Sequence, residues 1–385
     1  MLRPCRCFAC DVRQNHQSKA ALAGGLVAAS AVAGAIALGS RWLRHFDPAL
    51  VGYAIGSVCA AFAVAYRFTV WAQRPPSRMF FRRGLQLLFR RADVRGCDAS
   101  SQKVVATPRR ADPAAEASQL LPHGVGTLGR ALATKFVTQT FIARRSRLRW
   151  VMHICLSGGC TLAFAITFPL VFGWVHFESL PGNAEIYTVK ALGLAVDQVS
   201  VHSAKAFVMF NLLNFSAVIV LVGLVLAAWR RLTDAGERAT QKFFEDILPL
   251  LLIFAVTATG LALTVSYKFL AGRGHGLWAL VHMVSVVALL LYIPFGKLFH
   301  MFQRACSLCV SLYKKAGEHG ARAHCRACGE DFASQMHVDD LKTVLDQLGF
   351  DYRFATTRGE VHYSDICPAC RRRLLALNQG RSIGR

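Results

Sequence analysis

Two histidines enclose the last strongly hydrophobic stretch of the chain, HMVSVVALLLYIPFGKLFH, at positions 282 and 300. Ionisable side chains inside an apolar segment are energetically costly and are usually functional. If the stretch forms one helix, the separation corresponds to five turns, so His282 and His300 share a face about 27 Å apart along the axis. Two imidazoles in this arrangement suit axial ligation of two haems, one at each side of a membrane. The alternative is that each histidine anchors a helix end or hydrogen-bonds a neighbouring helix.

A haem iron takes a second axial ligand, and His153, in the stretch RLRWVMHICL, is placed to supply it opposite His300. His153 lies one turn inside the third hydrophobic stretch, which puts it at the same membrane depth as His300. Arg149 precedes His153 by four residues and Lys297 precedes His300 by three, so each basic side chain lies on the side of its histidine. Both could pair with haem propionates. Equally, both could be ordinary flanking charges that anchor a span.

Three Cys-x-x-Cys pairs, CSLC, CRAC and CPAC, lie in the C-terminal region. In a reducing compartment such knuckles most often bind zinc, and sometimes iron or an iron–sulfur cluster. CRAC and CPAC enclose a segment that predicts a helix followed by short strands, as in a zinc ribbon. Their thiols belong to Cys325, Cys328, Cys367 and Cys370. The competing pairing is CSLC with CRAC, which has the more usual spacing for a zinc site. Because CSLC belongs to an amphipathic continuation of the last hydrophobic stretch, we expect CRAC to pair with CPAC.

The N-terminal sequence RPCRCFACDV contributes three more cysteines, Cys5, Cys7 and Cys10. Together with Cys306 and Cys309 of CSLC they could hold a second metal ion. The simpler interpretation is that these are surface or packing thiols.

The composition is that of a membrane protein. The chain has 385 residues, of which 54% are hydrophobic, and a mean hydropathy of +0.36. A transmembrane helix needs about 20 mostly apolar residues, and six stretches meet that requirement. They are residues 20–39, 50–72, 148–174, 206–229, 247–269 and 277–299. The first is followed directly by a second span and starts too late to be a cleaved signal peptide.

The net charge of +23 is concentrated between the spans, which argues against a nucleic-acid partner. Residues 73–147 carry fifteen Lys and Arg against four acidic residues, and the tail after Phe302 is also basic. Cytoplasmic loops are enriched in Lys and Arg. The charge pattern therefore predicts a multi-pass protein of the inner (cell) membrane with both termini and the long loop in the cytoplasm.

We expect an all-α membrane protein, a six-span helical bundle with a four-helix haem-binding core. Its segments are a Cys-containing N-terminus (1–19), two accessory spans (20–72), a basic cytoplasmic loop (73–147), a membrane domain (148–302) and a cytoplasmic zinc-ribbon-like domain (303–385). Within the loop, SRMFFRRGLQLLFRR predicts an amphipathic helix on the anionic inner leaflet or against a partner. Residues 106–118 predict a linker, and residues 126–150 an amphipathic approach to the third span.

The stretches RSRLRWVMH and HMVSVVALLLYIPFGKLFH resemble the membrane cytochrome b subunits of respiratory complexes. The closest pattern is the γ subunit of respiratory nitrate reductases, with the related membrane subunits of heterodisulfide and dissimilatory sulfite reductase complexes. The resemblance covers residues 130–302 and includes a Pro-Phe-x-Lys-x-x-His pattern like IPFGKLFH. It implies a four-helix core, haem b and electron exchange with quinone. By this match His153 and His300 are ligands of an inner haem, and His282 is one ligand of an outer haem.

The chain departs from that family at the outer haem. The nitrate reductase pattern places the second outer ligand on the third span, ten residues after the histidine that corresponds to His153. That position is Ala163 here, which cannot bind iron. The other histidines near the outer surface are His176, His202 and His275. We expect His176 to be the partner of His282, provided that Pro169 bends the helix toward it. One haem is therefore expected, and a second stays open.

These observations favour an electron-transfer subunit over other classes. It would exchange electrons between quinone or quinol and a cytoplasmic iron–sulfur or molybdenum oxidoreductase that docks on the basic surface. The main alternative is a multi-span transporter or channel with histidine relays and a regulatory zinc-binding tail, although inverted repeats and acidic residues in the spans are missing. A membrane-anchored zinc sensor without redox chemistry is a third possibility. No hydrolase triad, P-loop or Rossmann fingerprint is present.

Overall fold

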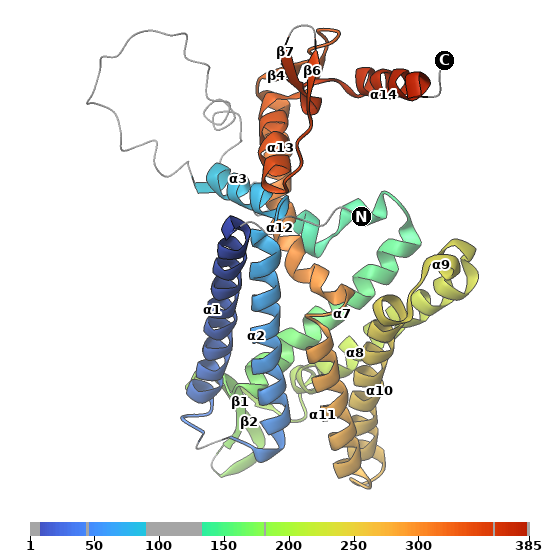
Figure 1. The fold of residues 1–385 in the computed structure, drawn as a ribbon. Coiled ribbons are helices and arrows are strands. Elements are labelled where there is room, and N and C mark those ends of the chain that lie inside the picture. The colour runs from blue at the N-terminus through green and yellow to red at the C-terminus, as the bar shows by residue number, and fades with distance from the viewer. Residues whose placement is uncertain (1–7, 44–45, 90–132, 181, 357–358, 383–385) are drawn as a thin grey trace. The chain divides into compact units, whose positions relative to one another are not determined.

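The computed structural model describes residues 8–43, 46–89, 133–180, 182–356 and 359–382. Six of its helices are long and apolar enough to cross a membrane, and they are drawn in Figure 1. They are α1 (Phe8–Gly39), α2 (Val51–Gln73), α7 (Arg147–Val171), α8 (Ala204–Thr233), α10 (Leu248–Phe269) and α11 (His275–Tyr292). Each contains most of one predicted span. The chain is therefore a multi-pass membrane protein, as the hydropathy pattern predicts.

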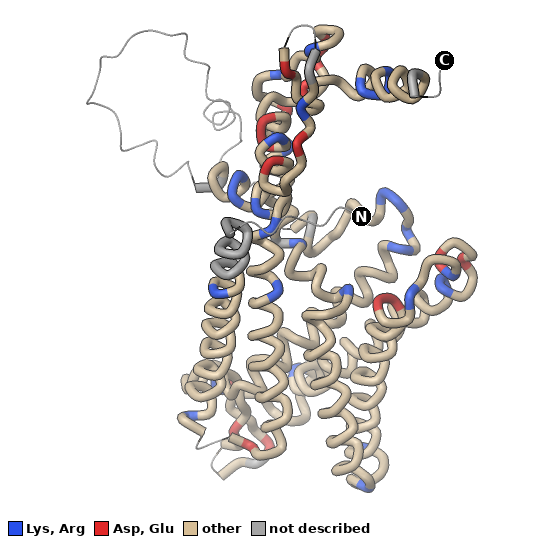
Figure 2. Tube along the Cα trace, viewed as in Figure 1, with Lys and Arg blue, Asp and Glu red and all other residues tan. Residues whose placement is uncertain are grey.

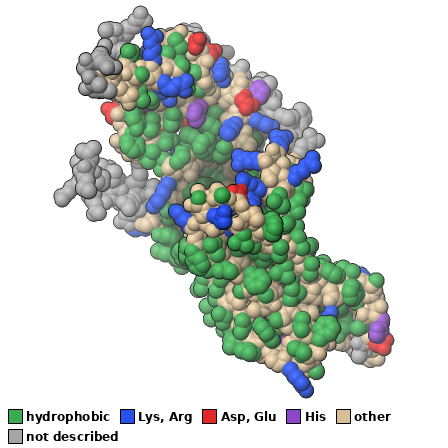
Figure 3. Space-filling view, turned by 90° about the vertical axis from the view of Figure 1, so that its right-hand side faces the viewer, with side chains coloured by type: hydrophobic (Ala, Val, Ile, Leu, Met, Phe, Trp, Pro, Cys, Tyr) green, Lys and Arg blue, Asp and Glu red, His purple; other side chains and the backbone are tan. Residues whose placement is uncertain are grey.

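The surface of these helices is apolar. Figure 2 shows Lys, Arg, Asp and Glu gathered mainly near helix ends and in the C-terminal part of the chain, and Figure 3 shows broad hydrophobic areas on one face of the molecule. Val225 on α8 and Leu280 on α11, for example, keep 66% and 53% of their surface exposed. A soluble protein does not leave so large an apolar surface in water, so these side chains face lipid.

Small residues allow the spans to approach closely. In α7, a Cβ added to Gly159 would lie 2.5 Å from a methyl carbon of Val220 in α8. The hydroxyl of Ser216 donates a hydrogen bond of 2.8 Å to the Gly159 carbonyl across the same contact. In α2, Gly56 packs against Val287 of α11. Contacts between small residues and hydrogen bonds replace the hydrophobic effect as the cause of helix association in lipid.

The prediction that His282 and His300 share one face of a single five-turn helix is wrong. Helix α11 ends at Tyr292, and after a turn a separate helix, α12 (His300–His319), begins. His282 therefore lies in the middle of α11, whereas His300 is the first residue of α12.

Two residues of the sequence cause this break. Pro294 has no N–H with which to continue the helix. A Cβ on Gly296 would lie 2.1 Å from Cζ of the Tyr292 ring, so the turn requires glycine. Arg67 of α2 stabilises the broken segment, since its guanidinium donates to the Pro294 carbonyl and lies 4.4 Å over the centre of the buried Phe299 ring.

The prediction of an all-α membrane part is wrong for the segment between α7 and α8. That segment forms an antiparallel sheet in the order β1 (Val175–Leu180), β2 (Asn183–Ala191) and β3 (Leu194–Ser200). Leu192 and Gly193 connect β2 to β3 with φ of 52° and 86°, the left-handed pair that a two-residue hairpin turn needs. Alternating β-branched and polar residues with turn glycines are the strand signal in this segment.

The chain divides into two compact units. The first comprises residues up to Thr69 and from Arg130 to Met301, and the second comprises residues 70–129 and 302–385. The first unit also contains short helical turns at Pro48–Leu50, Ala133–Val137, Thr140–Ala143, Ala235–Thr240 (α9), Phe243–Ile247 and Lys297–Phe299. The predicted linker at 106–118 and the first part of the predicted approach helix, 126–132, lie outside the described residues.

The second unit combines one helix of the basic segment with the C-terminal part of the chain. The predicted amphipathic helix is present as α3 (Ser77–Phe89). The C-terminal elements are β4 (Arg322–His324), β5 (Asp331–Ser334), α13 (Gln335–Gln347), β6 (Arg353–Thr356), β7 (Gly359–His362) and α14 (Pro368–Ser382). The helix followed by short strands that the sequence predicts between CRAC and CPAC is thus confirmed.

A charged cluster connects three helices of the second unit. Arg83 of α3 donates from Nε and Nη2 to the carboxylate of Asp340 in α13, at 2.9 to 3.2 Å. The hydroxyl of Tyr313 in α12 donates to the same carboxylate at 3.0 Å. Burial and the Asp340 charge raise the pKa of Tyr313. Asp340 is buried, whereas the Arg83 side chain is 42% exposed. The Asp340 carboxylate thus connects α3 and α12 to α13 through hydrogen bonds from Arg83 and Tyr313.

Candidate functional sites

The first candidate site is a pair of histidines in the first unit. His153 lies on α7 and His300 at the start of α12, and their ring centres are 6.4 Å apart with an interplanar angle of 75°. Metal–imidazole bonds are about 2 Å long, so two imidazoles on opposite sides of one metal have ring centres roughly 6 Å apart. The separation of the two rings is therefore compatible with both imidazoles binding one metal ion.

The backbone orients the His300 ring for such a role. Nδ1 of His300 lies 2.6 Å from the carbonyl oxygen of Lys297. A carbonyl can only accept, so in the neutral ring Nδ1 carries the proton and Nε2 is the unprotonated nitrogen. Metal-ligating histidines are oriented by this kind of hydrogen bond from the other ring nitrogen.

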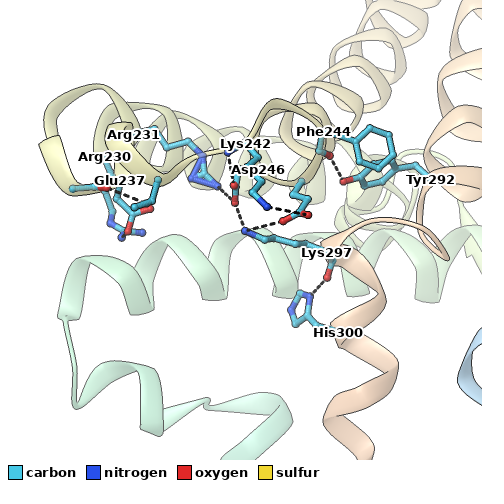
Figure 4. Close-up of polar contacts among 12 residues, drawn as sticks. Arg230, Arg231, Glu237, Lys242, Phe244, Asp246, Tyr292, Lys297 and His300 are labelled. Carbon is cyan, nitrogen blue, oxygen red and sulfur yellow. Dashed lines mark hydrogen bonds and ion pairs between the residues drawn. The ribbon is translucent and has the colours of Figure 1, made fainter. Parts of the chain in front are cut away.

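Lys297 is itself fixed by two acidic residues (Figure 4). Its ammonium group forms an ion pair with Asp246 and lies 4.0 Å from Glu245. Arg231 approaches the same Asp246 carboxylate at 3.9 Å. The Lys297 ammonium group, predicted to meet a propionate, is thus paired with a carboxylate of the Phe243–Ile247 segment just before α10. This ion pair positions Lys297, whose carbonyl lies beside His300.

Arg149, the other predicted propionate partner, occupies a similar position. Its guanidinium lies 3.9 Å from the Glu237 carboxylate, which also forms an ion pair with Arg230. Its own helix starts at a Ser146 cap whose hydroxyl accepts from the Arg149 N–H. Arg149 and Lys297 thus both lie among basic and acidic residues of the α8–α10 connection.

His282 lies apart from this pair, in the middle of α11. Its Nδ1 is 2.9 Å from Oγ1 of Thr259 on α10, and the Thr259 hydroxyl donates to the Ala255 carbonyl at 2.6 Å. Gly260 allows the close approach, since a Cβ there would lie 3.3 Å from Cε1 of His282.

The ring of His282 borders a cavity of about 530 Å³ between α2, α7, α8, α10 and α11. Its walls are mostly apolar and include the aromatic rings of Phe164 and Phe168. Ala163, the position at which the nitrate reductase pattern would place a histidine, is on the α7 wall of the same cavity.

His176 is placed elsewhere. It lies in β1, where its Nε2 is 3.1 Å from Oε1 of Glu178. Lys190 of β2 bonds the other oxygen of that carboxylate and is the main cause of the lowered pKa of Glu178. His176 is not among the described residues that line the cavity beside His282.

The second candidate site is a four-cysteine cluster in the second unit. The predicted pairing of CRAC with CPAC is present, since the thiol sulfurs of four cysteines all lie within 4.8 Å of one another. They are Cys325, Cys328, Cys367 and Cys370. A positive φ of 78° at Gly329 turns the chain, so that the Cys325 N–H can donate to the Glu330 carbonyl at 2.9 Å. The cluster can hold a metal ion such as zinc.

Hydrogen bonds shift the pKa values of these thiols in opposite directions. Burial raises the pKa of Cys325, but N–H donors of Cys367, Cys328 and Ala327 outweigh it and lower that pKa to about 6. Hydrogen bonding with Cys367 raises the pKa of Cys370 to about 12. Without a cation the four sulfurs cannot all ionise together, and a bound metal supplies the charge that allows this.

The other predicted cysteine site is only partly described. Cys306 and Cys309 lie one turn apart on α12, and burial raises the pKa of the Cys306 thiol to about 11. A Cβ on Gly84 of α3 would lie 2.2 Å from Cβ of Cys309, so Cys309 packs against α3. Cys5, Cys7 and the side chain of Cys10 lie outside the described residues.

The sequence alone does not single out three further functional candidates, which are Thr259, Asn214 and Asp246. Thr259 and Asn214 are polar residues within apolar spans, a signal that points to functional or packing roles. Asp246 lies at the start of a span, where its link to Lys297 depends on tertiary structure.

In comparisons with protein-family models, with curated proteins and with solved structures, no match to this chain was found.

Proposed function

We propose that this protein is a membrane cytochrome b-type electron-transfer subunit that holds one haem b between His153 and His300. The observation that carries the proposal is the 6.4 Å separation of the two ring centres on helices that are far apart in the sequence. When bound there, haem supplies one-electron redox chemistry to a protein whose own side chains have none at ordinary potentials.

The chain's own residues fix the ligands. The Lys297 carbonyl keeps the proton of His300 on Nδ1, and the ion pair with Asp246 keeps Lys297 in place. The side chains of Arg149 and Lys297 are 47% and 56% exposed. They would supply positive charge near the two histidines, partly offset by the carboxylates with which they pair. Positive charge near a haem favours its propionates and the reduced iron.

The wider role follows from charge and composition. The basic segment 73–147 and the basic tail favour a cytoplasmic location of both termini, because cytoplasmic loops are enriched in Lys and Arg. A cytoplasmic iron–sulfur or molybdenum oxidoreductase would dock on this basic surface and exchange electrons with quinone through the haem. The four-cysteine cluster would hold zinc and stabilise the C-terminal domain.

The test is a reduced-minus-oxidised visible spectrum of the purified protein with a haem-to-protein ratio. We expect a b-type α band at one haem per chain. His153→Ala and His300→Ala should each abolish the band. The matched control is His202→Ala, because His202 is an exposed histidine just before α8 and its loss should leave the spectrum unchanged. Absence of haem from wild-type protein produced with ample haem would refute the proposal.

A further inference from the structure

The cavity beside His282 has the character of a ligand site rather than a packing defect. Its volume of about 530 Å³ falls in the range of small-molecule pockets, which are mostly apolar with a few polar groups that converge. Several of its hydroxyls are already committed to carbonyls of their own or a neighbouring helix, as for Thr167, Ser216 and Thr257. Four polar side chains of the described lining keep hydrogen-bonding capacity for a ligand: Tyr53, Ser57, Asn214 and His282. His282 and Asn214 are the two whose orientation is fixed by hydrogen bonds to neighbouring helices or side chains.

His282 presents a hydrogen-bond acceptor to the cavity. Thr259 donates its only hydroxyl proton to the Ala255 carbonyl at 2.6 Å, so its oxygen accepts from Nδ1–H of His282 at 2.9 Å. In a neutral imidazole with the proton on Nδ1, Nε2 is an acceptor. A ligand that meets this nitrogen must offer an O–H or N–H group.

Asn214 presents a donor from α8. Its Oδ1 accepts from Thr264 at 2.9 Å, and its Nδ2 donates to Oδ1 of Asn211 at 3.2 Å. Lys268 donates to that same Asn211 oxygen at 2.7 Å. These bonds fix the orientation of the Asn214 amide, and a second N–H of Nδ2 is left to donate.

The walls suit a neutral ring better than a second haem. A haem needs a second axial ligand and positive charge for its propionates, and the described residues that line the cavity contain one histidine and no Lys or Arg. Ala163 occupies the wall position that the cytochrome pattern gives to the second ligand. Because alanine stands in place of a histidine at this position, the cavity has space beside His282 for a neutral ring of a ligand.

We propose that this cavity binds the ring of a quinol, with one ring hydroxyl donating to Nε2 of His282 and the other accepting from the Asn214 amide. The apolar remainder of the cavity, with Phe164 and Phe168, would surround the ring and the start of its hydrophobic tail. The inference rests on the proposed electron exchange with quinone and names the site where that partner binds.

The experiment is calorimetric titration of decylubiquinol into the full-length protein in lipid nanodiscs under anaerobic conditions. We expect saturable binding to the wild type, and a loss of affinity of at least tenfold in His282→Ala and in Asn214→Leu. Thr259→Val tests the orientation of the imidazole with little change in shape, and we expect several-fold weaker binding. His275→Ala, on the same helix but outside the cavity, is the matched control and should bind as the wild type does.

Two further readouts separate this inference from the haem proposal. His153→Ala should lose the haem but keep decylubiquinol affinity within about twofold, since His153 is not among the described residues that line the cavity. Equal affinity in the wild type, His282→Ala and Asn214→Leu, or no binding to wild type, would overturn the quinol site even if haem is present. A fall in haem content from two to one per chain in His282→Ala would show that the cavity is a haem site instead.

Discussion

At the scale of single residues, His282 and His300 are oriented by the same kind of hydrogen bond. In each ring Nδ1 is held by an oxygen, from the Lys297 carbonyl for His300 and from the Thr259 hydroxyl for His282. In the neutral form both imidazoles therefore carry the proton on Nδ1, and Nε2 is the unprotonated nitrogen. Their surroundings differ, since His300 faces a second imidazole and His282 faces a mostly apolar cavity.

The four-cysteine cluster gives a prediction at the same scale. Cys325→Ser and Cys370→Ser should each reduce bound zinc from about one ion per chain to near zero, because a structural zinc site needs four ligands. Metal analysis of purified protein measures the stoichiometry. Removing zinc with a chelator should lower the thermal stability of the C-terminal domain, since metal binding is coupled to folding.

The control for the cysteine variants is Cys59→Ser. Cys59 lies on α2, exposed and distant in sequence from the CRAC and CPAC knuckles, so its replacement should leave the zinc content unchanged. Retention of full zinc content in both cluster variants would mean that these cysteines do not hold the metal.

At the scale of elements, the break between α11 and α12 decides where His300 goes. In a continuous helix, His300 would lie five turns from His282 along the axis of α11. The turn at Pro294 and Gly296, held by Arg67, instead starts a new helix whose first residue lies beside His153. The break is therefore a condition for the histidine pair.

Gly296→Ala tests this role. The added methyl group would overlap the Tyr292 ring, at 2.1 Å from Cζ, and overpacking costs about 1–3 kcal/mol. We expect a lower thermal unfolding temperature together with reduced haem content, because the shifted turn moves His300. Both are measured on the same preparation, by thermal scanning and by the visible spectrum.

Gly34→Ala in α1 is the matched control. A Cβ there meets nothing within 4 Å, and alanine in a helix is favoured over glycine by about 0.5–1 kcal/mol. Its stability should be equal or slightly higher, with unchanged haem. If Gly296→Ala behaves like this control, the turn does not position the ligand.

At the scale of the whole molecule, the cavity is a property of the bundle rather than of any one helix. Five helices contribute its walls, and small residues such as Gly56 and Gly260 set how closely those helices approach. The same arrangement brings Ala163 and His282, far apart in the sequence, to the walls of one cavity.

This arrangement predicts a gain of function. Ala163→His adds a second imidazole to the cavity that His282 lines, and two imidazoles are a common axial ligand set for haem b. We expect the haem-to-protein ratio to rise from one toward two and decylubiquinol affinity to fall, because haem would fill the space. Ala163→Leu, of similar bulk but without a ligand nitrogen, should lower quinol affinity alone. An unchanged haem ratio in a folded Ala163→His variant would contradict the prediction.

Much of the architecture follows from local sequence. Runs of about 20 apolar residues can only be satisfied as helices in a bilayer, so the six spans are predictable. Two Cys-x-x-Cys knuckles around a helix and short strands likewise predict the four-cysteine cluster. The sheet between α7 and α8 shows an alternation of β-branched and polar residues and a Leu-Gly turn. This strand signal is weak beside the strongly hydrophobic spans that flank it.

The sequence by itself determined the spans, the charge asymmetry and the identity of the candidate ligands, because these depend on composition and on short-range spacing. Only the tertiary structure decided which ligands meet. Pro294 and Gly296 end α11 locally, but the turn is held by Arg67, a residue more than two hundred positions earlier in the chain, which donates to the Pro294 carbonyl. Likewise Thr259 orients His282 and Asp246 holds Lys297 through contacts between different helices. Such contacts arise from packing in three dimensions, and no local pattern encodes them.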